Sequence, residues 1–307
     1  LTSAGAITDT STASTTVAGN AALSGTSITV GDQVGDVFNA VTLTFTSAGA
    51  VAISEDSGTD LTGTSTAGSL ALTSAGAITD TAAASTTVAG NASLAGTAIT
   101  LGDTGTDVFN ALSLTFNSAG AVAISEDSAT DLSGTSAANT LTLTSTGAIT
   151  DATTASTTVT GNAAFSGTAI TLGYGASGPA GDMFNVGSLT FTSAGAVAIT
   201  EDSSTDLAGV GTAGVSTAGS LVLASAGAIT DQAAVSLTVA GTASFSGTSI
   251  SLADSAGDVL SVGAGVANAS FTASGGGAIT VAATGTVNFG TLTFNTSGAV
   301  SITEDSA

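Results

Sequence analysis

An internal repeat that runs through the whole chain constrains its fold more than any other feature. The motif LTSAGAITD occurs at residues 1–9 and 72–80, with close variants at 143–151 and 223–231. A second motif, AVAISED at 50–56, returns at 121–127 and, slightly changed, at 196–202 and 299–305. The first motif recurs after 71, 71 and 80 residues (72 − 1, 143 − 72 and 223 − 143). We therefore divide the chain into repeats 1–71, 72–142, 143–222 and 223–307, and expect one continuous domain over 1–307.

Each long repeat contains shorter units. In each unit an apolar residue is followed by small residues and a glycine, and then by another apolar residue. Glycines in the first repeat, Gly5, Gly25, Gly49 and then Gly76, mark steps of 20, 24 and 27 residues. Such a unit is too short for a sandwich domain and suits one coil of a β-solenoid, in which each turn stacks on the last. With one extra coil at 271–280, the pattern predicts about thirteen coils, three per long repeat.

The apolar residues alternate with threonine and serine, as expected of half-buried strands. Examples are VTLTF at 41–45, LSLTF at 112–116 and TLTLT at 140–144. No helical period is visible, and the abundant Val, Ile and Thr favour extended backbone. Crossovers between parallel strands are almost always right-handed. The predicted fold is therefore all-β, a right-handed parallel β-helix (β-solenoid) with almost no helix.

The chain contains no Lys, Arg, His or Cys, and its 22 acidic residues give a net charge of −22. Without basic side chains it cannot neutralise phosphates, so we expect no nucleic-acid partner. No apolar run reaches the ~18 residues of a membrane span, so we expect no membrane insertion. Imidazole and thiolate chemistry are excluded, and paired carboxylates copied with every repeat are unlike a single catalytic cleft. We expect no enzyme activity and assign no catalytic or cofactor-binding residue.

All 22 acidic residues belong to three motifs of the long repeat. The first is the aspartate that ends GAITD: Asp9, Asp80, Asp151 and Asp231. The second is D-x-x-x-D: Asp32 and Asp36, Asp103 and Asp107, Asp254 and Asp258, with Asp182 alone in the third repeat. The third is E-D-x-x-x-D: Glu55, Asp56 and Asp60; Glu126, Asp127 and Asp131; Glu201, Asp202 and Asp206. The last two acids of the chain, Glu304 and Asp305, are the first two residues of a fourth copy.

Two interpretations of these acids stay open. In the first, they end strands, cap turns and keep an apolar solenoid soluble, and no cofactor is bound. In the second, clustered carboxylates bind Ca²⁺, a cation that takes 6–8 oxygen ligands. The candidate calcium ligands are Glu55, Asp56, Asp60, Glu126, Asp127, Asp131, Glu201, Asp202, Asp206, Asp32, Asp36, Asp103 and Asp107. The E-D-x-x-x-D motif is the better candidate, because its three acids are expected to converge within one turn.

The motifs LTSAGAITD, TTVAGNA (residues 15–21) and AVAISED together resemble the β-strand-repeat regions of giant bacterial surface proteins, which are filamentous-haemagglutinin-like exoproteins. The resemblance covers essentially the whole chain. It implies secretion to the bacterial cell surface and a right-handed parallel β-helix shaft. It also implies the role of an extracellular fibre or filament, or of an adhesin stalk that binds glycans or a host surface. It transfers no catalytic residue.

Self-association is the partner that the sequence favours. The sequence opens inside a repeat and stops at EDSA, without a capping segment at either end. Because open strand edges recruit other strands, we expect head-to-tail contact between copies, or a longer chain of the same repeats. Rows of outward threonines, such as Thr42 and Thr44, also raise ice binding as a remote alternative, although the row is broken in the neighbouring coil.

Overall fold

The computed structural model describes residues 1–173, 182–208, 214–263 and 267–305. Within these ranges nearly all regular structure is parallel β-strand, and the one short helix is the 3₁₀ turn η2 (Ser274–Gly276). The chain is an all-β parallel β-solenoid of about thirteen turns, as the repeat predicts. No described helix has the length and apolar character needed to cross a membrane.

The chain divides into two compact units, Leu1–Thr146 and Gly147–Ala307. In the first unit the strands are β1 (Ile7–Thr8), β2 (Ser14–Ser24), β3 (Ile28–Val30), β4 (Val37–Thr46), β5 (Ala50–Glu55), β6 (Thr59–Leu61), β7 (Thr64–Ala67), β8 (Ser69–Ser74), β9 (Ile78–Asp80), β10 (Ser85–Ala95), β11 (Ile99–Leu101), β12 (Val108–Asn117), β13 (Ala121–Glu126), β14 (Thr130–Leu132), β15 (Thr135–Ala138) and β16 (Thr140–Ser145).

In the second unit the strands are β17 (Ile149–Asp151), β18 (Ser156–Ser166), β19 (Ile170–Leu172), β20 (Met183–Thr192), β21 (Ala196–Glu201), β22 (Thr205–Leu207), β23 (Val215–Ala218), β24 (Ser220–Ser225), β25 (Ile229–Asp231), β26 (Ser236–Val239), β27 (Ala243–Gly247), β28 (Ile250–Leu252), β29 (Val259–Val262), β30 (Asn268–Ala273), β31 (Ile279–Val281), β32 (Thr286–Asn288), β33 (Thr291–Asn295) and β34 (Val300–Ile302).

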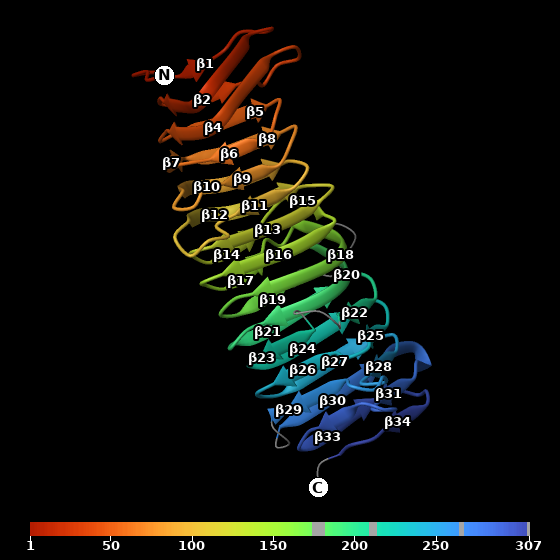
Figure 1. Cartoon of the computed structure of the whole chain (residues 1–307). Coiled ribbons are helices and arrows are strands. Elements are labelled where there is room, and N and C mark those ends of the chain that lie inside the picture. Colours follow the sequence, from red (N-terminus) through yellow and green to blue (C-terminus); the bar gives the residue numbers. More distant parts are fainter. Residues whose placement is uncertain (174–181, 209–213, 264–266, 306–307) are drawn as a thin grey trace. The chain divides into compact units, whose positions relative to one another are not determined.

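The strands of the first unit stack on one another from turn to turn (Figure 1), and like residues lie above one another. Ile7 pairs with Ile28, Ile28 with Val51 and Val51 with Leu70, so one column of the core contains strands β1, β3, β5 and β8. Side chains alternate inward and outward along each strand, and these apolar residues point inward and are buried. Every second residue of a strand therefore joins an aliphatic ladder, which explains the alternating sequence pattern.

The second unit is built in the same way, and its core includes stacked aromatic rings. Leu221 pairs with Ala243, Ala243 with Ala269 and Ala269 with Leu292, again one residue per turn. The rings of Phe245 and Phe271 lie parallel, with centroids 5.2 Å apart. The narrow interior thus accepts phenylalanine where the ring can stack on its counterpart in the next turn.

The long repeat does not span a whole number of turns. Ile78 is the counterpart of Ile7 in the next repeat, yet it pairs with Thr59 of β6 and not with Leu70 of the Ile7 column. Strand β6 stacks on β4 in a second column, where Leu61 pairs with Leu43. The 71 residues therefore advance the chain by three turns and about half of a fourth.

The expectation of three coils per long repeat is thus wrong, and the glycine spacing explains the error. The residue that stacks over Gly49 is Gly68, whose N–H donates to the Gly49 carbonyl at 2.8 Å. The 27-residue step from Gly49 to Gly76 therefore contains one turn and part of the next. As a consequence, equivalent motifs in the first and second repeats lie on different columns of the unit.

Candidate metal centres

Each copy of the GAITD motif places its aspartate at the end of a strand, beside the next turn. Asp9 follows β1, and its Oδ2 accepts a hydrogen bond from the N–H of Gly31 at 2.7 Å. Gly31 has φ of +69°, and a Cβ there would lie 2.1 Å from the Ser54 carbonyl oxygen. A side chain at this position would therefore require the backbone to shift. Gly31 both turns the chain and presents its N–H to Asp9; in the fourth repeat Ala253, with φ of +54°, takes the equivalent place and donates to Asp231.

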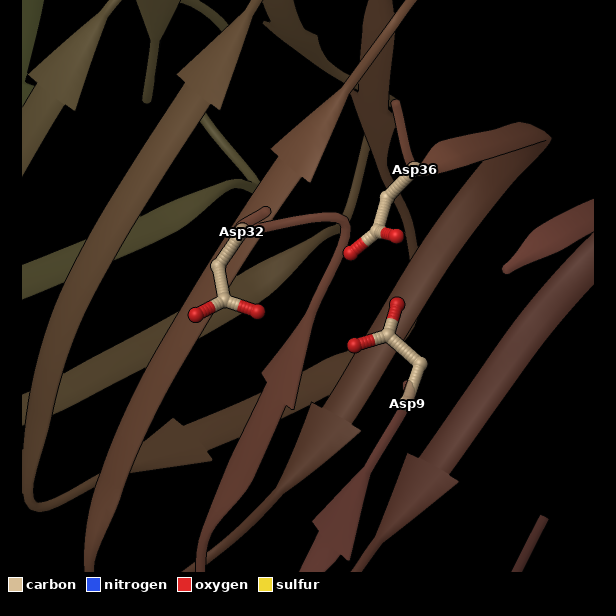
Figure 2. A group of neighbouring side chains, drawn as sticks. All are labelled: Asp9, Asp32 and Asp36. Carbon is tan, nitrogen blue, oxygen red and sulfur yellow. The ribbon is translucent and has the colours of Figure 1, made fainter. Parts of the chain in front are cut away.

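The same corner brings three aspartates together (Figure 2). Asp9 comes from one turn, and Asp32 and Asp36 come from the loop between β3 and β4 in the next. One carboxylate oxygen from each residue lies within 4.8 Å of the other two. In Figure 2 the carboxylates of Asp9 and Asp36 point toward each other, with Asp32 beside them. The D-x-x-x-D motif therefore supplies two acids of the cluster, and the preceding GAITD motif supplies the third.

Asp36 is the anchored member of this cluster, since only 7% of its surface is exposed. Its Oδ1 accepts from the N–H of Ala13 at 3.0 Å, and its Oδ2 accepts from the N–H of Gln33 at 3.1 Å. Asp32 is exposed and closes the cluster on the solvent side. Backbone donors thus fix one carboxylate, while another remains open to solvent.

Two further triads repeat this geometry, and we call all three the aspartate triads. They are Asp9, Asp32 and Asp36; Asp80, Asp103 and Asp107; and Asp231, Asp254 and Asp258. In each copy the strand-end aspartate accepts a hydrogen bond from the corner N–H, and the last aspartate is buried and accepts two backbone N–H groups.

One oxygen of every triad has no partner among the described residues. Oδ1 of Asp9, of Asp80 and of Asp231 exposes less than 1 Å² and receives no hydrogen bond. Buried carboxylate oxygens are ordinarily satisfied by donors or cations. This recurrent unpartnered oxygen distinguishes the strand-end aspartate from its two neighbours in the loop.

Burial and mutual repulsion make two of these aspartates weak acids. The pKa of Asp80 is raised to about 6, mainly by burial; the hydrogen bond from Gly102 opposes the rise, and the charges of Asp107, Asp103 and Asp60 contribute to it. Burial raises the pKa of Asp231 to about 7, with smaller contributions from Asp258, Asp254 and Asp206. No basic side chain exists in the chain to offset these effects.

The third repeat departs from this pattern. Asp151 accepts from the N–H of Gly173 at 2.7 Å, as its counterparts do. Asp182 is the remaining acid of the D-x-x-x-D motif there; burial raises its pKa, and a hydrogen bond to Asp151 opposes that rise. Residues 174–181, which stand between these two segments, lie outside the described ranges. In this repeat a hydrogen-bonded pair of acids, Asp151 and Asp182, stands where the other repeats have a triad.

The E-D-x-x-x-D acids have a different task, and they do not form the expected cluster. Glu55 is buried, and its Oε1 accepts from the N–H of Ala40 at 2.9 Å, while its Oε2 accepts from the Thr59 hydroxyl at 2.8 Å. Asp56 accepts from the N–H of Phe38 at 3.0 Å. These two acids accept backbone N–H groups at the start of β4, ahead of Leu43, the residue that pairs with β6 of the following turn.

The last acid of that motif faces elsewhere. Asp60 accepts from the hydroxyl of Thr79, one turn further on, at 3.0 Å. Glu55, Asp56 and Asp60 are therefore not among the described groups whose carboxylate oxygens converge. The same caps recur, from Glu126 and Asp127 to Ala111 and Phe109, and from Glu201 and Asp202 to Val186 and Phe184.

Of the candidate calcium ligands, the structure thus brings Asp32 with Asp36, and Asp103 with Asp107, into common clusters. The candidate ligands do not include Asp9, Asp80 and Asp231, which join these pairs from the preceding turn, or the fourth-repeat pair Asp254 and Asp258. The available signal was the offset of 22 residues between Asp9 and Gly31, which is one turn of the solenoid. Calcium binding itself stays a prediction.

Comparison with known protein families identifies the family to which the repeat belongs. The profile of a family described as repeats of unknown function (DUF5649) matches residues 48–115, 119–177 and 194–260, which together make up more than half of the chain. The chain belongs to this family. No curated protein and no solved structure matches it significantly.

The DUF5649 matches begin at equivalent alanines, Ala48, Ala119 and Ala194, at the turn before AVAISED or AVAITED. The first match contains the triad of Asp80, Asp103 and Asp107, and the third contains that of Asp231, Asp254 and Asp258. A DUF5649 unit in this chain therefore includes one Glu-Asp cap, one GAITD corner and, in these two copies, one complete triad.

Proposed function

We propose that this chain is a structural segment of a bacterial extracellular fibre or cell-surface shaft. The observation that carries the proposal is the in-register stacking of like residues from turn to turn, as in Ile7, Ile28 and Val51. In such a fold, added repeats extend the solenoid without altering its side surface or its core. The repeated sequence is therefore best suited to building a solenoid whose length increases with the number of repeats.

The surface location rests on the resemblance of the motifs to β-strand-repeat regions of filamentous-haemagglutinin-like exoproteins, and on the charge. A chain with 22 acids and no basic residue repels nucleic acid and anionic lipid. It also contains no Lys or Arg, the residues at which trypsin-like proteases cut. Both properties suit a material exposed outside the cell.

Self-association is part of the proposal. In β33, Leu292 and Phe294 are 38% and 53% exposed, whereas their counterparts Leu43 and Phe45 in β4 are completely buried. These side chains fit another turn of the same kind, because inner turns cover their counterparts with in-register apolar residues. Further repeats, in the same chain or in a second copy, supply such a turn.

Electron microscopy of negatively stained particles tests the shaft. We compare the chain with a variant that lacks residues 72–142, a deletion that keeps the phase of the repeat. The proposal expects particles about one quarter shorter with unchanged width. Particles that shrink equally in all directions would overturn it. Antibody labelling of intact cells of the producing organism is expected to be positive, and labelling only after lysis would contradict the surface location.

An adhesin stalk that binds glycans is the alternative function. It shares the shaft and adds a ligand. Binding of the purified chain to a glycan array, saturable and lost on heating, would favour the stalk. A chain that gives no glycan signal but yields particles of repeat-dependent length would favour the purely structural role.

A further inference from the structure

We propose that each of the three aspartate triads binds one Ca²⁺, which holds two successive turns of the solenoid together. The inference goes beyond the proposed function, because a shaft requires stacking and no metal. It rests on three features of the triads: their geometry, an unpartnered buried oxygen, and the lack of any other positive charge.

The geometry suits calcium. Oxygens on opposite sides of a Ca²⁺ ion are about 5 Å apart, since each Ca–O bond is about 2.3–2.6 Å long. The triad oxygens lie within 4.8 Å of one another, a separation that ligands of one Ca²⁺ ion can have. Mg²⁺ requires near-ideal octahedral geometry and gives up its water reluctantly, so a set of carboxylates open to solvent on one side favours Ca²⁺. The exposed side at Asp32 or Asp103 leaves room for the water molecules that complete a calcium shell.

The unpartnered oxygen is the second feature, and it does not depend on the clustering. Oδ1 of Asp9, Asp80 and Asp231 is buried without a hydrogen-bond donor, although Oδ2 of each residue has one. The carboxylate of Asp9 is directed at Asp36 (Figure 2). A carboxylate oxygen that faces other carboxylates and lacks a donor is the environment that a cation satisfies.

Charge is the third feature. Each triad carries up to three negative charges, and the chain has no Lys, Arg or His that could neutralise them. Only a proton or an external cation can do so. In the third repeat, Asp151 and Asp182 form a hydrogen-bonded pair of acids, and we assign no ion there.

Equilibrium dialysis against calcium in about 150 mM salt at pH 7.5 tests the proposal, where salt screens diffuse attraction to the acidic surface. We expect about three ions per chain from the three triads. The informative variant is Asp103→Asn, because Asp103 is exposed and its replacement leaves the core and the buried caps intact. It is expected to bind about two ions.

The matched control is Asp131→Asn, which removes the same charge outside all three triads and is expected to bind three ions. Circular dichroism confirms that both variants are folded. The proposal is overturned by no saturable binding up to about 1 mM calcium, by three ions on Asp103→Asn, or by equal losses in both variants. Displacement of calcium by an equal concentration of magnesium would overturn the choice of ion. None of these results bears on particle length, so the two proposals fail separately.

Discussion

At the scale of single residues, the acidic side chains of this chain fall into two groups with different roles. The Glu-Asp pairs act as substitutes for backbone carbonyls, and the triad aspartates gather negative charge at a corner. Glu126 and Asp80 both stand at the end of a strand, so the sequence alone does not separate them. What separates them is the donor set: Glu126 receives hydrogen bonds from Ala111, Ser128 and Thr130, whereas Asp80 retains an unpartnered oxygen.

Replacement of the Glu126 cap is expected to destabilise the fold. In Glu126→Ala, the buried N–H of Ala111 and the hydroxyl of Thr130 lose their acceptor, at about 1–3 kcal/mol for each unsatisfied group. We expect a loss of about 3 kcal/mol in the free energy of unfolding, measured by urea denaturation. Glu126→Gln keeps an acceptor oxygen and is expected to lose clearly less. Equal losses in the two variants would show that the cap is not the cause.

The pH dependence of the metal-free protein follows from the raised pKa values. A carboxyl with a higher pKa in the folded state than in the unfolded state binds its proton more tightly when folded. Its stabilising effect is complete below the unfolded pKa of about 4 and is lost as pH rises through the folded pKa, about 6 for Asp80 and about 7 for Asp231.

We therefore expect the melting temperature in chelator to be roughly 2–6 °C higher at pH 5 than at pH 8. The double variant Asp80→Asn with Asp231→Asn keeps an acceptor oxygen at each position and removes both titrating carboxyl groups. Its melting temperature should therefore depend much less on pH. Burial also raises the pKa of Glu126 and Glu201, which accounts for the slope expected to remain. A melting temperature that rises from pH 5 to pH 8 would contradict this account.

At the scale of the structural elements, corners are specified more strictly than strands. Strands tolerate exchanges among Val, Ile and Leu, as Ile7, Ile28, Val51 and Leu70 show in a single column. The corner is more restricted, because Gly31, Gly102 and Gly173 have positive φ and a Cβ there would lie 2.0–2.3 Å from a carbonyl oxygen of the next turn. In the fourth repeat Ala253 takes the same place, with φ of +54°.

The corner at Gly102 provides a direct test. Gly102 has φ of +65°, and a Cβ would lie 2.3 Å from the Ser125 carbonyl oxygen. Gly102→Ala is expected to lower the free energy of unfolding by about 2 kcal/mol or more in chelator. Gly105→Ala is the control, since a Cβ there meets nothing within 4 Å, and we expect a change within about 0.5 kcal/mol. Similar losses of unfolding free energy in the two variants would show that the corner at Gly102 is not restricted to residues without a side chain.

The half-turn offset of the repeat can be tested by disulfide trapping, because the chain has no cysteine of its own. Ala52 pairs with Ala71 in the next turn, so Ala52→Cys with Ala71→Cys should cross-link under mild oxidation. If the repeat spanned three whole turns, Ala52 would instead neighbour Thr79. We expect Ala52→Cys with Thr79→Cys to keep free thiols. Efficient cross-linking of that pair would show that the repeat spans three whole turns.

At the scale of the whole molecule, the sequence predicted the architecture, but neither the half-turn offset of the repeat nor the full membership of the aspartate triads. The parallel all-β solenoid followed from the 71-residue repeat and from alternation such as VTLTF, since both are properties of the local chain. The fractional turn and the triads are relations between turns. They depend on which residue lies above which, as Gly31 lies beside Asp9, and insertions of one or two residues at a corner alter that register.

The central claim is that this solenoid, through its repeat, builds carboxylate centres that join successive turns by calcium. The most direct measurement is an anomalous difference map from crystals grown in calcium, with data collected at long wavelength. The account predicts peaks between Asp80, Asp103 and Asp107, and at the two counterpart triads that contain Asp9 and Asp231. Peaks beside the caps at Glu55 or Glu126, or triads without density in crystals saturated with calcium, would contradict it.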